Sequence, residues 1–377
     1  MRNFEVRNRH FDTLFNTQGL MWLGQNTNHF PAHPAVIDAM ITSVRAEEWH
    51  AYAPPAGMQE LRELILADVG LPEAAVLVTD GAVEALYNAC RSLAAPGVDF
   101  VTTDPGWKWP MAFAAASGAN IVEIPIYKPE NGYRLTVAQL EAAVTERTRL
   151  VYLVDPNNPL GICYTPEEIE AFAGIAKRVG AYFIHDSTYR DVADRHTLAA
   201  RFYPERAITV YSFSKWLGLA GLRVGALIAA PELIERLAAA PPNNLGCNVV
   251  SQRAAIAGLK VKPTWFPEIN RRQRRNQAEI HAAVARVPGL SIAVYPSQAN
   301  FLVIECVGAG ITPEALCAAY RDEGIMIRQG TYHTPTFGHR FVKVSTTVPE
   351  DWADAFCVRL PAMVEKARGL RDVGPLF

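Results

Sequence analysis

The sequence predicts an α/β fold, in which a mostly parallel sheet lies between helices, with a smaller α+β unit beside it. Seven short apolar runs recur through the first part of the 377-residue chain, and helical patterns separate them. Most of these runs are apolar throughout, a pattern typical of strands that are covered on both faces. The predicted strands are residues 75–80, 100–104, 121–126, 150–155, 182–186, 208–214 and 224–230.

Helix signals stand between several of these strands. Residues 83–93 repeat apolar side chains at helical spacing and predict an amphipathic helix. Thr136 with Gln139, and Thr165 with Glu168, have the spacing of a capping box, so each threonine is expected to begin a helix. Strands that alternate with helices in this way indicate an α/β sheet.

The pattern changes in the last third of the chain. A long helical stretch runs to about Val287. A strand, a helix, two strands and a closing helix are then predicted at residues 300–305, 313–322, 325–329, 341–345 and 351–366. We therefore expect a large domain of residues 46–275 and a small domain made of residues 1–45 and 276–377.

Composition and charge narrow the range of partners. The 36 Lys and Arg residues nearly balance the 38 Asp and Glu residues, so neither a nucleic acid nor an anionic membrane is an expected partner. The first ten residues are charged and lack the apolar core of a signal peptide, and no uncharged apolar run is long enough for a membrane span. We therefore predict a cytoplasmic protein.

The cysteines and histidines point to neither disulfides nor a metal. The six cysteines form no CxxC pair, and they are expected to be reduced and mostly buried thiols. The nine histidines show no spacing typical of metal ligands, so no metal is predicted.

The most informative segment begins at the end of the strand predicted at 208–214. Ser212, Ser214 and Lys215 follow one another there, and Arg223 comes eight residues after the lysine in a glycine-rich turn. A lysine in this place would lie at the carboxyl edge of a parallel sheet, where α/β proteins bind ligands. Two hydroxyls, a lysine and an arginine suit a phosphate group beside a reactive amine. Taken by itself, the lysine would be better explained as a surface residue after a strand.

Other polar residues follow other predicted strands. Asp186 ends one strand, where a buried carboxylate requires a partner, and Asn158 lies just after another. Residues 79–83 end a strand and begin a helix, whose N-terminal N–H groups can bind an anion. Trp107 adds an aromatic ring after a further strand. Because these features all follow strands at their carboxyl ends, one cleft could collect them.

Together these segments resemble the class I/II aminotransferases, the fold-type-I group of pyridoxal-phosphate enzymes, and most of all their histidinol-phosphate-aminotransferase-like members. The segments SFSKxxGLAGLRxG, PNNPLG, DxxY and VTDGAVEAL match in order and spacing, and the resemblance extends from about Leu23 to Val364. It implies a large domain with a seven-stranded, mostly parallel sheet that binds pyridoxal 5'-phosphate.

The resemblance also implies a role for each matching residue. Lys215 would form an imine with the cofactor aldehyde and then move protons at the substrate Cα. Asp186 would face the pyridine nitrogen and keep it protonated, so that the ring can accept electrons. Trp107 would stack on the ring, although Trp109 is an alternative stacker. Asn158 and Tyr189 would bond the phenolic oxygen.

The phosphate group would be bound by a further set of residues. Tyr52 resembles the tyrosine that reaches the phosphate from the neighbouring subunit, which implies an obligate homodimer. Tyr52 could otherwise be only a turn residue. The remaining phosphate ligands would be the backbone amides of Gly81, Ala82 and Val83, and the side chains of Ser212, Ser214 and Arg223.

The sequence departs from the family pattern at the expected substrate site. The strand at 341–345 carries Lys343 where the family usually has the arginine that grips the substrate α-carboxylate. Lysine is a point charge and cannot make the planar two-donor fork of arginine. Lys343 could therefore hold the carboxylate alone, and Arg328 is a second possible anion partner. Asn158 and His29 complete the expected substrate-binding residues. His29 ends an unusually polar segment and is either an acid/base residue over the cofactor or part of a hydrogen-bonded loop.

The predicted function is transamination between an amino acid and a 2-oxo acid through Lys215. The unusual Lys343 and His29 leave another reaction at the amino-acid Cα as an alternative. That reaction could be oxidation by dioxygen, as in pyridoxal-phosphate-dependent arginine oxidases, or a decarboxylation, elimination or cyclisation. A non-catalytic binding protein is a third hypothesis, and the presence of both Lys215 and Asp186 argues against it.

Overall fold

The computed structural model describes residues 2–239, 245–370 and 373–374. Its largest sheet has seven strands in the order β2-β8-β7-β6-β5-β3-β4, and β8 is the antiparallel strand among otherwise parallel ones. The α/β class and all seven predicted strands are confirmed. The strands are β2 (Ala75–Thr79), β3 (Asp99–Asp104), β4 (Asn120–Pro125), β5 (Thr148–Val154), β6 (Tyr182–Asp186), β7 (Ala207–Ser212) and β8 (Gly225–Ala229).

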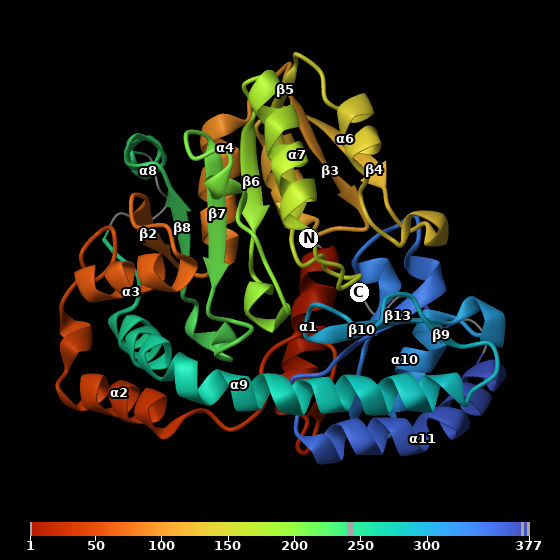
Figure 1. Cartoon of the computed structure of the whole chain (residues 1–377). Helices are drawn as coiled ribbons and strands as arrows, with labels where there is room; N and C mark the ends of the chain where they lie inside the picture. The colour runs from red at the N-terminus through yellow and green to blue at the C-terminus, as the bar shows by residue number, and fades with distance from the viewer. Residues whose placement is uncertain (1, 240–244, 371–372, 375–377) are drawn as a thin grey trace.

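Helices cover both faces of this sheet, with α7 on one face and α4 on the other in Figure 1. Successive residues of β5 explain the continuous apolar runs. Tyr152 packs in one core cluster together with α4, and Leu153 packs in another together with α7. The helices of this part are α3 (Gln59–Val69), α4 (Ala82–Leu93), α5 (Trp109–Ala116), α6 (Val137–Ala143), α7 (Pro166–Arg178) and α8 (Pro231–Ala238).

Both predicted capping boxes are confirmed. The Thr136 side chain accepts a hydrogen bond from the backbone N–H of Gln139, and the Gln139 side chain reaches back to the threonine. Thr165 and Glu168 form the same reciprocal pair at the start of α7. These local bonds satisfy N–H groups that the first turn of a helix leaves unpaired.

The C-terminal part is built on a four-stranded antiparallel sheet in the order β12-β13-β10-β9. The long helix α9 runs beneath both the large sheet and this part, with α11 beside it (Figure 1). The predicted domain limit between residues 275 and 276 falls inside α9, so the two-domain division stays a prediction. The elements are α9 (Val249–Ala285), β9 (Ser291–Ile292), β10 (Phe301–Glu305), α10 (Pro313–Arg321), β11 (Ile325–Met326), β12 (Arg328–Gln329), β13 (Phe341–Ser345) and α11 (Glu350–Gly369).

One predicted strand is wrong in detail. Residues 325–329 do not form a single strand, because the chain changes partners at Ile327. Met326 pairs in parallel with Trp22 of β1 (Met21–Trp22), whereas Arg328 pairs with Lys343 of β13. Apolar character alone does not distinguish one strand from two that belong to different sheets.

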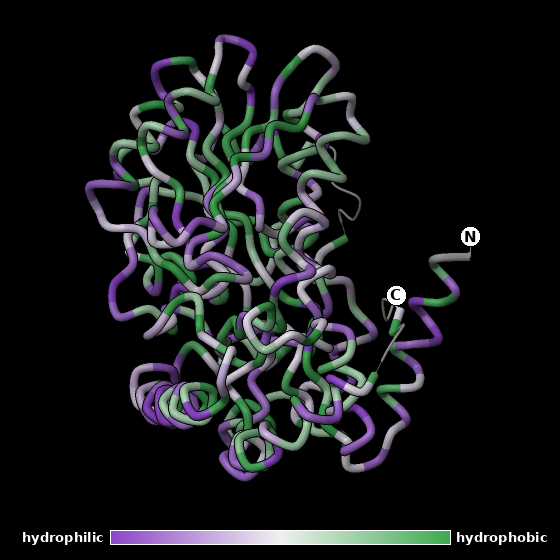
Figure 2. Tube along the Cα trace, turned by 90° about the vertical axis from the view of Figure 1, so that its right-hand side faces the viewer, coloured by the Kyte–Doolittle hydropathy of each residue, from purple (hydrophilic) through white to green (hydrophobic). Residues whose placement is uncertain are grey.

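The N-terminal segment contains helices that the sequence analysis did not predict. Helix α1 (Arg2–Asn16) projects from the body of the molecule in Figure 2, and its Leu14 packs with Leu20 and Met326. Helix α2 (Pro34–Arg45) packs against α9, and its Val36 belongs to a core cluster that also holds residues of the large sheet. Part of the segment assigned to the small domain therefore packs with the large sheet.

All six cysteines are free, and four of them are buried. Among the described helices, none combines the length and the apolar character needed to cross a bilayer.

The tight contact between β8 and the start of α4 yields a stability test. A Cβ added to Gly225 would lie 2.6 Å from the backbone nitrogen of Ala82, so Gly225→Ala must displace backbone. We expect this substitution to lower the free energy of unfolding by about 1–3 kcal/mol, as overpacking does. The measurement is chemical denaturation of purified protein.

Gly174→Ala is the matched control. Gly174 is exposed in α7, and a Cβ added there meets no atom within 4 Å. The same substitution should stabilise the protein by about 0.5–1 kcal/mol, because alanine favours the helix interior. Equal changes in the free energy of unfolding for Gly225→Ala and Gly174→Ala would contradict the close packing of β8 against the start of α4.

Candidate active site

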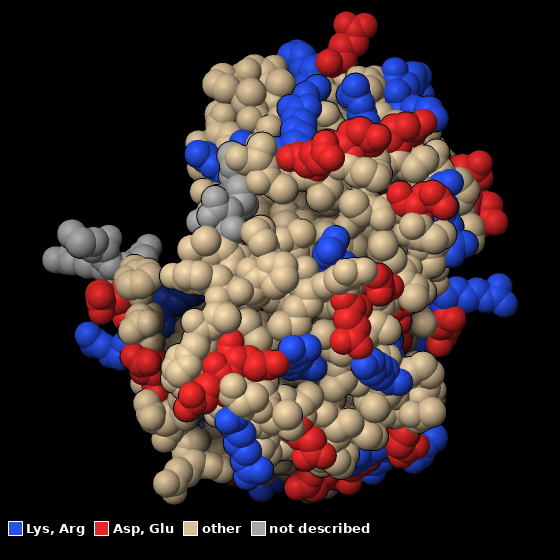
Figure 3. Space-filling view, turned by 90° about the vertical axis from the view of Figure 1, so that its left-hand side faces the viewer, with Lys and Arg blue, Asp and Glu red and all other residues tan. Residues whose placement is uncertain are grey.

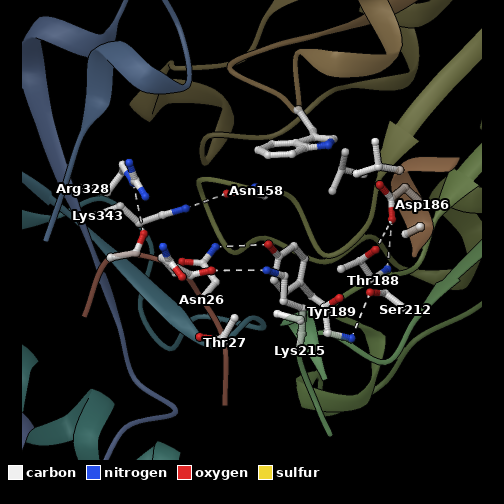
Figure 4. A pocket seen from close by; sticks show the side chains of 18 of the residues that line it. Asn26, Thr27, Asn158, Asp186, Thr188, Tyr189, Ser212, Lys215, Arg328 and Lys343 are labelled. Atoms are coloured by element: carbon white, nitrogen blue, oxygen red, sulfur yellow. Dashed lines mark hydrogen bonds between the residues drawn. The ribbon is translucent and has the colours of Figure 1, made fainter. Parts of the chain in front are cut away.

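The parallel arrangement of β5, β6 and β7 brings three strand ends to one edge of the sheet. Val154 pairs with Asp186, and Asp186 pairs with Val210, so these strands end nearly level. A cavity of about 250 Å³ lies at this edge. Side chains converge on it from the ends of β6 and β7, from the turn after β5 and from the C-terminal sheet (Figure 4).

Most of the predicted site residues line this cavity. Gly81 precedes Ala82 as the N-cap residue of α4, at the edge of the cavity. Tyr52 and His29 are absent from the described residues that line it. The predicted residues that do line it are Ala82, Val83, Trp107, Asn158, Asp186, Tyr189, Ser212, Ser214, Lys215, Arg223, Arg328 and Lys343.

Asp186 is a buried carboxylate that several donors support. Oδ1 accepts hydrogen bonds from the Thr188 hydroxyl at 2.6 Å and from the Thr188 backbone N–H at 3.1 Å. Oδ2 accepts a hydrogen bond from the Tyr152 hydroxyl at 3.0 Å. Burial raises the pKa of Asp186, and the bonds from Thr188 and Tyr152 act against that rise.

Lys215 extends from the end of β7 into the same cavity. Its Nζ donates a hydrogen bond to the backbone oxygen of Gln25 at 3.3 Å. Burial, and next the positive charge of Arg223, lower the pKa of Lys215 to about 8, although the charge of Asp186 opposes this. Near physiological pH the neutral form of this amine is therefore far more populated than that of an ordinary lysine, which favours nucleophilic attack.

One end of the cavity gathers hydrogen-bond donors and a positive charge, which suit an anion. The N-terminus of α4 opens there, and the Ser212 hydroxyl accepts a hydrogen bond from the Ser214 backbone N–H at 3.2 Å. Arg223 adopts a left-handed backbone (φ 52°) and donates to the backbone oxygens of Ala220 at 2.8 Å and Asp80 at 3.2 Å. Its guanidinium contacts Gly81 so closely that a Cβ at Gly81 would collide with it.

Aromatic and amide groups form the walls of the cavity. Trp107 lines it, whereas the alternative Trp109 does not and instead lies under the guanidinium of Arg7. Asn26 donates from Nδ2 to the Tyr189 hydroxyl at 3.1 Å, and Figure 4 shows Asn26 between Lys343 and Tyr189.

The other end of the cavity is cationic. Lys343 is fully buried, and its Nζ donates to Asn158 Oδ1 at 3.2 Å. Burial, followed by the positive charges of Arg328 and Lys215, lowers the pKa of Lys343 well below its usual range. Arg328 donates from Nε to the Gly24 backbone oxygen at 3.3 Å and lies 4.7 Å from the Tyr332 ring centroid.

The overall charge of the cavity favours anionic ligands. Among the described residues that line it, Asp186 is the only carboxylate, whereas the cations are Lys215, Arg223, Arg328 and Lys343. Like charges held together in a partly buried space attract counter-ions. A ligand with two anionic groups, one at each end, would offset this excess of positive charge.

His29 and Tyr52 lie elsewhere. Nε2 of His29 is 2.8 Å from the Thr27 hydroxyl, and the imidazole ring packs against Trp352. Burial, and next the charge of Lys215, lower the pKa of His29 to about 4, so the ring is neutral at physiological pH. This geometry matches the hydrogen-bonded loop, one of the two interpretations of His29. Tyr52 is 81% exposed.

Several residues that line or support this cavity are not among those predicted from the sequence. Phe11 of α1, Asn26 and Tyr332 line the cavity, and Tyr152 lies behind Asp186. Asn26 stood in a segment already recognised as unusually polar. Phe11 and Tyr332 carried no local signal, because tertiary packing brings them to the cavity.

A second group of ionisable residues lies behind the turn that carries Asn158. Asp155 Oδ2 is 3.3 Å from Nε2 of both His185 and His196. Nδ1 of His185 accepts a hydrogen bond from the Ala199 backbone N–H at 3.1 Å, so a neutral ring carries its proton on Nε2 and donates it to Asp155. These bonds explain the cluster as a structural network beside Asp186.

These residues fit pyridoxal phosphate, the cofactor expected from the sequence. The buried Asp186 carboxylate would face the ring nitrogen, Lys215 would meet the aldehyde, and Trp107 would cover the ring. The close contact between Gly81 and Arg223 allows the guanidinium to lie at the start of α4, where a phosphate would be bound. The negative charge of the phosphate would also offset part of the excess of basic side chains in the cavity.

Comparisons with known proteins give consistent results. A sequence model of the family described as Aminotransferase class I and II matches residues 18–360. The histidinol-phosphate aminotransferase of Rhodospirillum centenum is 32% identical over 325 residues, which cover 84% of this chain and 85% of its own length. The aspartate/prephenate aminotransferase of Thermus thermophilus is 28% identical over 314 residues, 80% of each chain.

Solved structures also resemble this one. The N-succinyldiaminopimelate aminotransferase of Mycobacterium tuberculosis superposes with a TM-score of 0.84 and 26% identity, over 93% of this chain and 95% of that one. The aspartate aminotransferase of Thermus thermophilus with maleate has a TM-score of 0.82 at 23% identity over 96% of each chain, and this likeness concerns the fold. These names give no support to the oxidase, decarboxylase, lyase or cyclase alternatives.

The lowered pKa of Lys215 yields a test. Because the amine loses its proton near pH 8, the rate at which cofactor-free protein develops absorbance with pyridoxal phosphate should rise with a midpoint near pH 8 rather than near 10.5. Nα-acetyl-lysine is the control, with a midpoint near about 10.4. Matching midpoints for the protein and the free amine would contradict the description of Lys215.

Proposed function

The chain belongs to the class I and II aminotransferase family and is a pyridoxal-phosphate-dependent aminotransferase, and on this premise we propose which residues carry its reaction. The observation that carries the proposal is one cavity that collects Lys215, Asp186 and Asn158 from the ends of neighbouring strands. An α-amino acid is the donor and a 2-oxo acid the acceptor. The histidinol-phosphate and aspartate aminotransferases among its relatives indicate substrates that carry anionic groups.

The cofactor residues hold the reacting centre in place. When bound, pyridoxal phosphate supplies an aldehyde for amines and a ring that delocalises the electron pair left at the substrate Cα. Ser212, Ser214, Arg223 and the start of α4 bind the phosphate. Trp107 excludes water from one face of the ring. The Tyr189 hydroxyl, supported by Asn26, and the Asn158 amide bind the phenolic oxygen.

Lys215 moves the proton in this proposal. Its Nζ takes the proton from the substrate Cα, since a pKa near 8 leaves the free amine basic and about half unprotonated at that pH. Asp186 retains a negative charge opposite the ring nitrogen, because Thr188 and Tyr152 donate hydrogen bonds to its carboxylate. The two side chains therefore have separate tasks in one cavity.

Lys343, Arg328 and Asn158 recognise the substrate α-carboxylate. Lys343 already directs its Nζ to Asn158 from the cationic end of the cavity (Figure 4). An arriving carboxylate would raise the pKa of this lysine again, since an adjacent opposite charge stabilises the ammonium form. A single ammonium and two neighbouring donors would then replace the usual arginine fork.

The proposed dimer places Tyr52 at the cofactor phosphate of a second copy. Exposed apolar side chains lie on α2 and α4 and near Tyr52, among them Ile41, Trp49 and Tyr87. The side of the molecule that carries α2, α3 and α8 has a broad area with few charged residues (Figure 3). Val83 is both partly exposed and part of the cavity wall, so the phosphate end lies near this surface. The cytoplasmic location stays a prediction.

Transamination is tested by supplying single amino acids to the cofactor-loaded protein without a 2-oxo acid. We expect each site to release one equivalent of the 2-oxo acid and then to stop, because no acceptor regenerates it. Chromatography of the products measures the yield. The Lys215→Ala variant should release no 2-oxo acid. Continued release accompanied by oxygen uptake would overturn the proposal in favour of an oxidase.

The same assay tests Lys343. Loss of a hydrogen bond to a charged group weakens binding by about tenfold to a hundredfold. Lys343→Met should therefore lower kcat/KM for amino acids by that factor, mainly through a higher KM. Lys343→Arg should fold and alter the preference among substrates. Lys177→Met removes an exposed lysine 3.6 Å from Glu205 and serves as the control. An unchanged KM in Lys343→Met would contradict the assignment.

Mixed dimers test Tyr52. Lys215→Ala and Tyr52→Phe subunits would each form impaired homodimers, the second through cofactor binding weakened by about tenfold. A hybrid dimer would contain one site with an intact Lys215 and an intact Tyr52. Activity at limiting cofactor should therefore reappear on mixing and refolding. No recovery, with hybrids verified by mass spectrometry, would show that Tyr52 serves no partner site.

A further inference from the structure

Tyr152 is a buried residue that the proposed reaction does not otherwise use. It lies on β5, is 1% exposed, and packs with Phe100 at a ring separation of 5.9 Å. It pairs across the sheet with Ile184, two residues before Asp186. This placement holds the phenol hydroxyl 3.0 Å from Asp186 Oδ2.

The hydrogen bonds to Asp186 leave one acceptor position open. An ionised carboxylate offers about four lone-pair positions. The Thr188 backbone N–H and hydroxyl take the two on Oδ1, and the Tyr152 hydroxyl takes one on Oδ2. The open position is therefore on the oxygen that Tyr152 contacts. Asp186 lines the cavity, so this oxygen is the one available to a ligand.

The buried setting makes each of these donors important. A carboxylate without donors in a low-dielectric site would take up a proton and become neutral. Thr188 is fixed by its neighbouring backbone, whereas Tyr152 acts from another strand. The other ionisable groups around this pair are His185 on β6, Lys215 after β7, Tyr189, and Cys90 on α4.

We propose that Tyr152 is a positioning residue that keeps Asp186 ionised and orients its open Oδ2 acceptor toward the ring nitrogen of the cofactor. The proposal rests on the proposed function, which places Asp186 opposite that nitrogen. With the Tyr152 bond, the shared proton belongs to the ring nitrogen. Without the bond, the neutral pair of a carboxylic acid and an unprotonated ring gains population.

The test reads the ring nitrogen directly. Protein is loaded with ¹⁵N-labelled pyridoxal phosphate, and the ¹⁵N chemical shift is measured across pH. In Tyr152→Phe the signal should move toward that of an unprotonated pyridine. In the same variant kcat should fall by about tenfold to a hundredfold, the range of one hydrogen bond to a charged group, with little change in KM.

Tyr320→Phe is the matched control. Tyr320 is also a fully buried tyrosine, and its hydroxyl donates to the Phe356 backbone oxygen at 2.8 Å, away from the cavity. Its loss should affect stability but leave the ¹⁵N signal in place. If both variants move the signal alike, or neither does, Tyr152 has no specific role and the proposal is overturned.

Two further variants separate the possible failures. Asp186→Asn should move the ¹⁵N signal fully, and Tyr152→Phe should add nothing in that background, since Tyr152 acts through Asp186. An unchanged signal in Asp186→Asn would instead refute the placement of Asp186, and with it the premise. If Tyr152→Phe does not fold, 3-fluorotyrosine at position 152 decides. This analogue keeps the hydroxyl and makes it a stronger hydrogen-bond donor. The ¹⁵N signal of the ring should then move in the direction opposite to its shift in Asp186→Asn. An unmoved signal would overturn the proposal.

Discussion

The parallel pairing of β5, β6 and β7 is the constraint on which the site depends. Backbone hydrogen bonds hold these strands nearly level, so the residues that follow them meet at one edge. Asn158, Asp186 and Lys215 are far apart in the chain but share one cavity for this reason. Helices on both faces bury the strands, and that burial makes the sheet rigid enough to orient the three side chains.

Charge is distributed unequally around this edge. Among the described residues that line the cavity, one carboxylate faces four basic side chains. Two of these are Lys215 and Lys343, and burial together with neighbouring positive charges lowers the pKa of both. Such an arrangement is unfavourable in an empty site and becomes favourable when anions arrive. A phosphate at the start of α4 and a carboxylate near Lys343 would supply the missing charge at opposite ends.

The replacement of the usual arginine by Lys343 gains a structural context. Lys343 pairs on β13 with both Val303 and Arg328, and its ammonium reaches Asn158. Arg328 therefore enters the same end of the cavity from the neighbouring strand. Two cations on adjacent strands can surround a carboxylate from two directions, which a lone ammonium cannot do.

Local patterns in the sequence determined the seven strands of the large sheet, both capping boxes and the identity of most cavity residues, because apolar runs, caps and strand-end residues act over a few positions. The single strand predicted at 325–329 was wrong, because its two halves pair in different sheets. Only the tertiary structure decided that Phe11 of α1 reaches the cavity, that His29 bonds to Thr27 without itself lining the cavity, and that Tyr152 contacts Asp186. These contacts join residues through strand register and helix packing, which no short segment of sequence specifies.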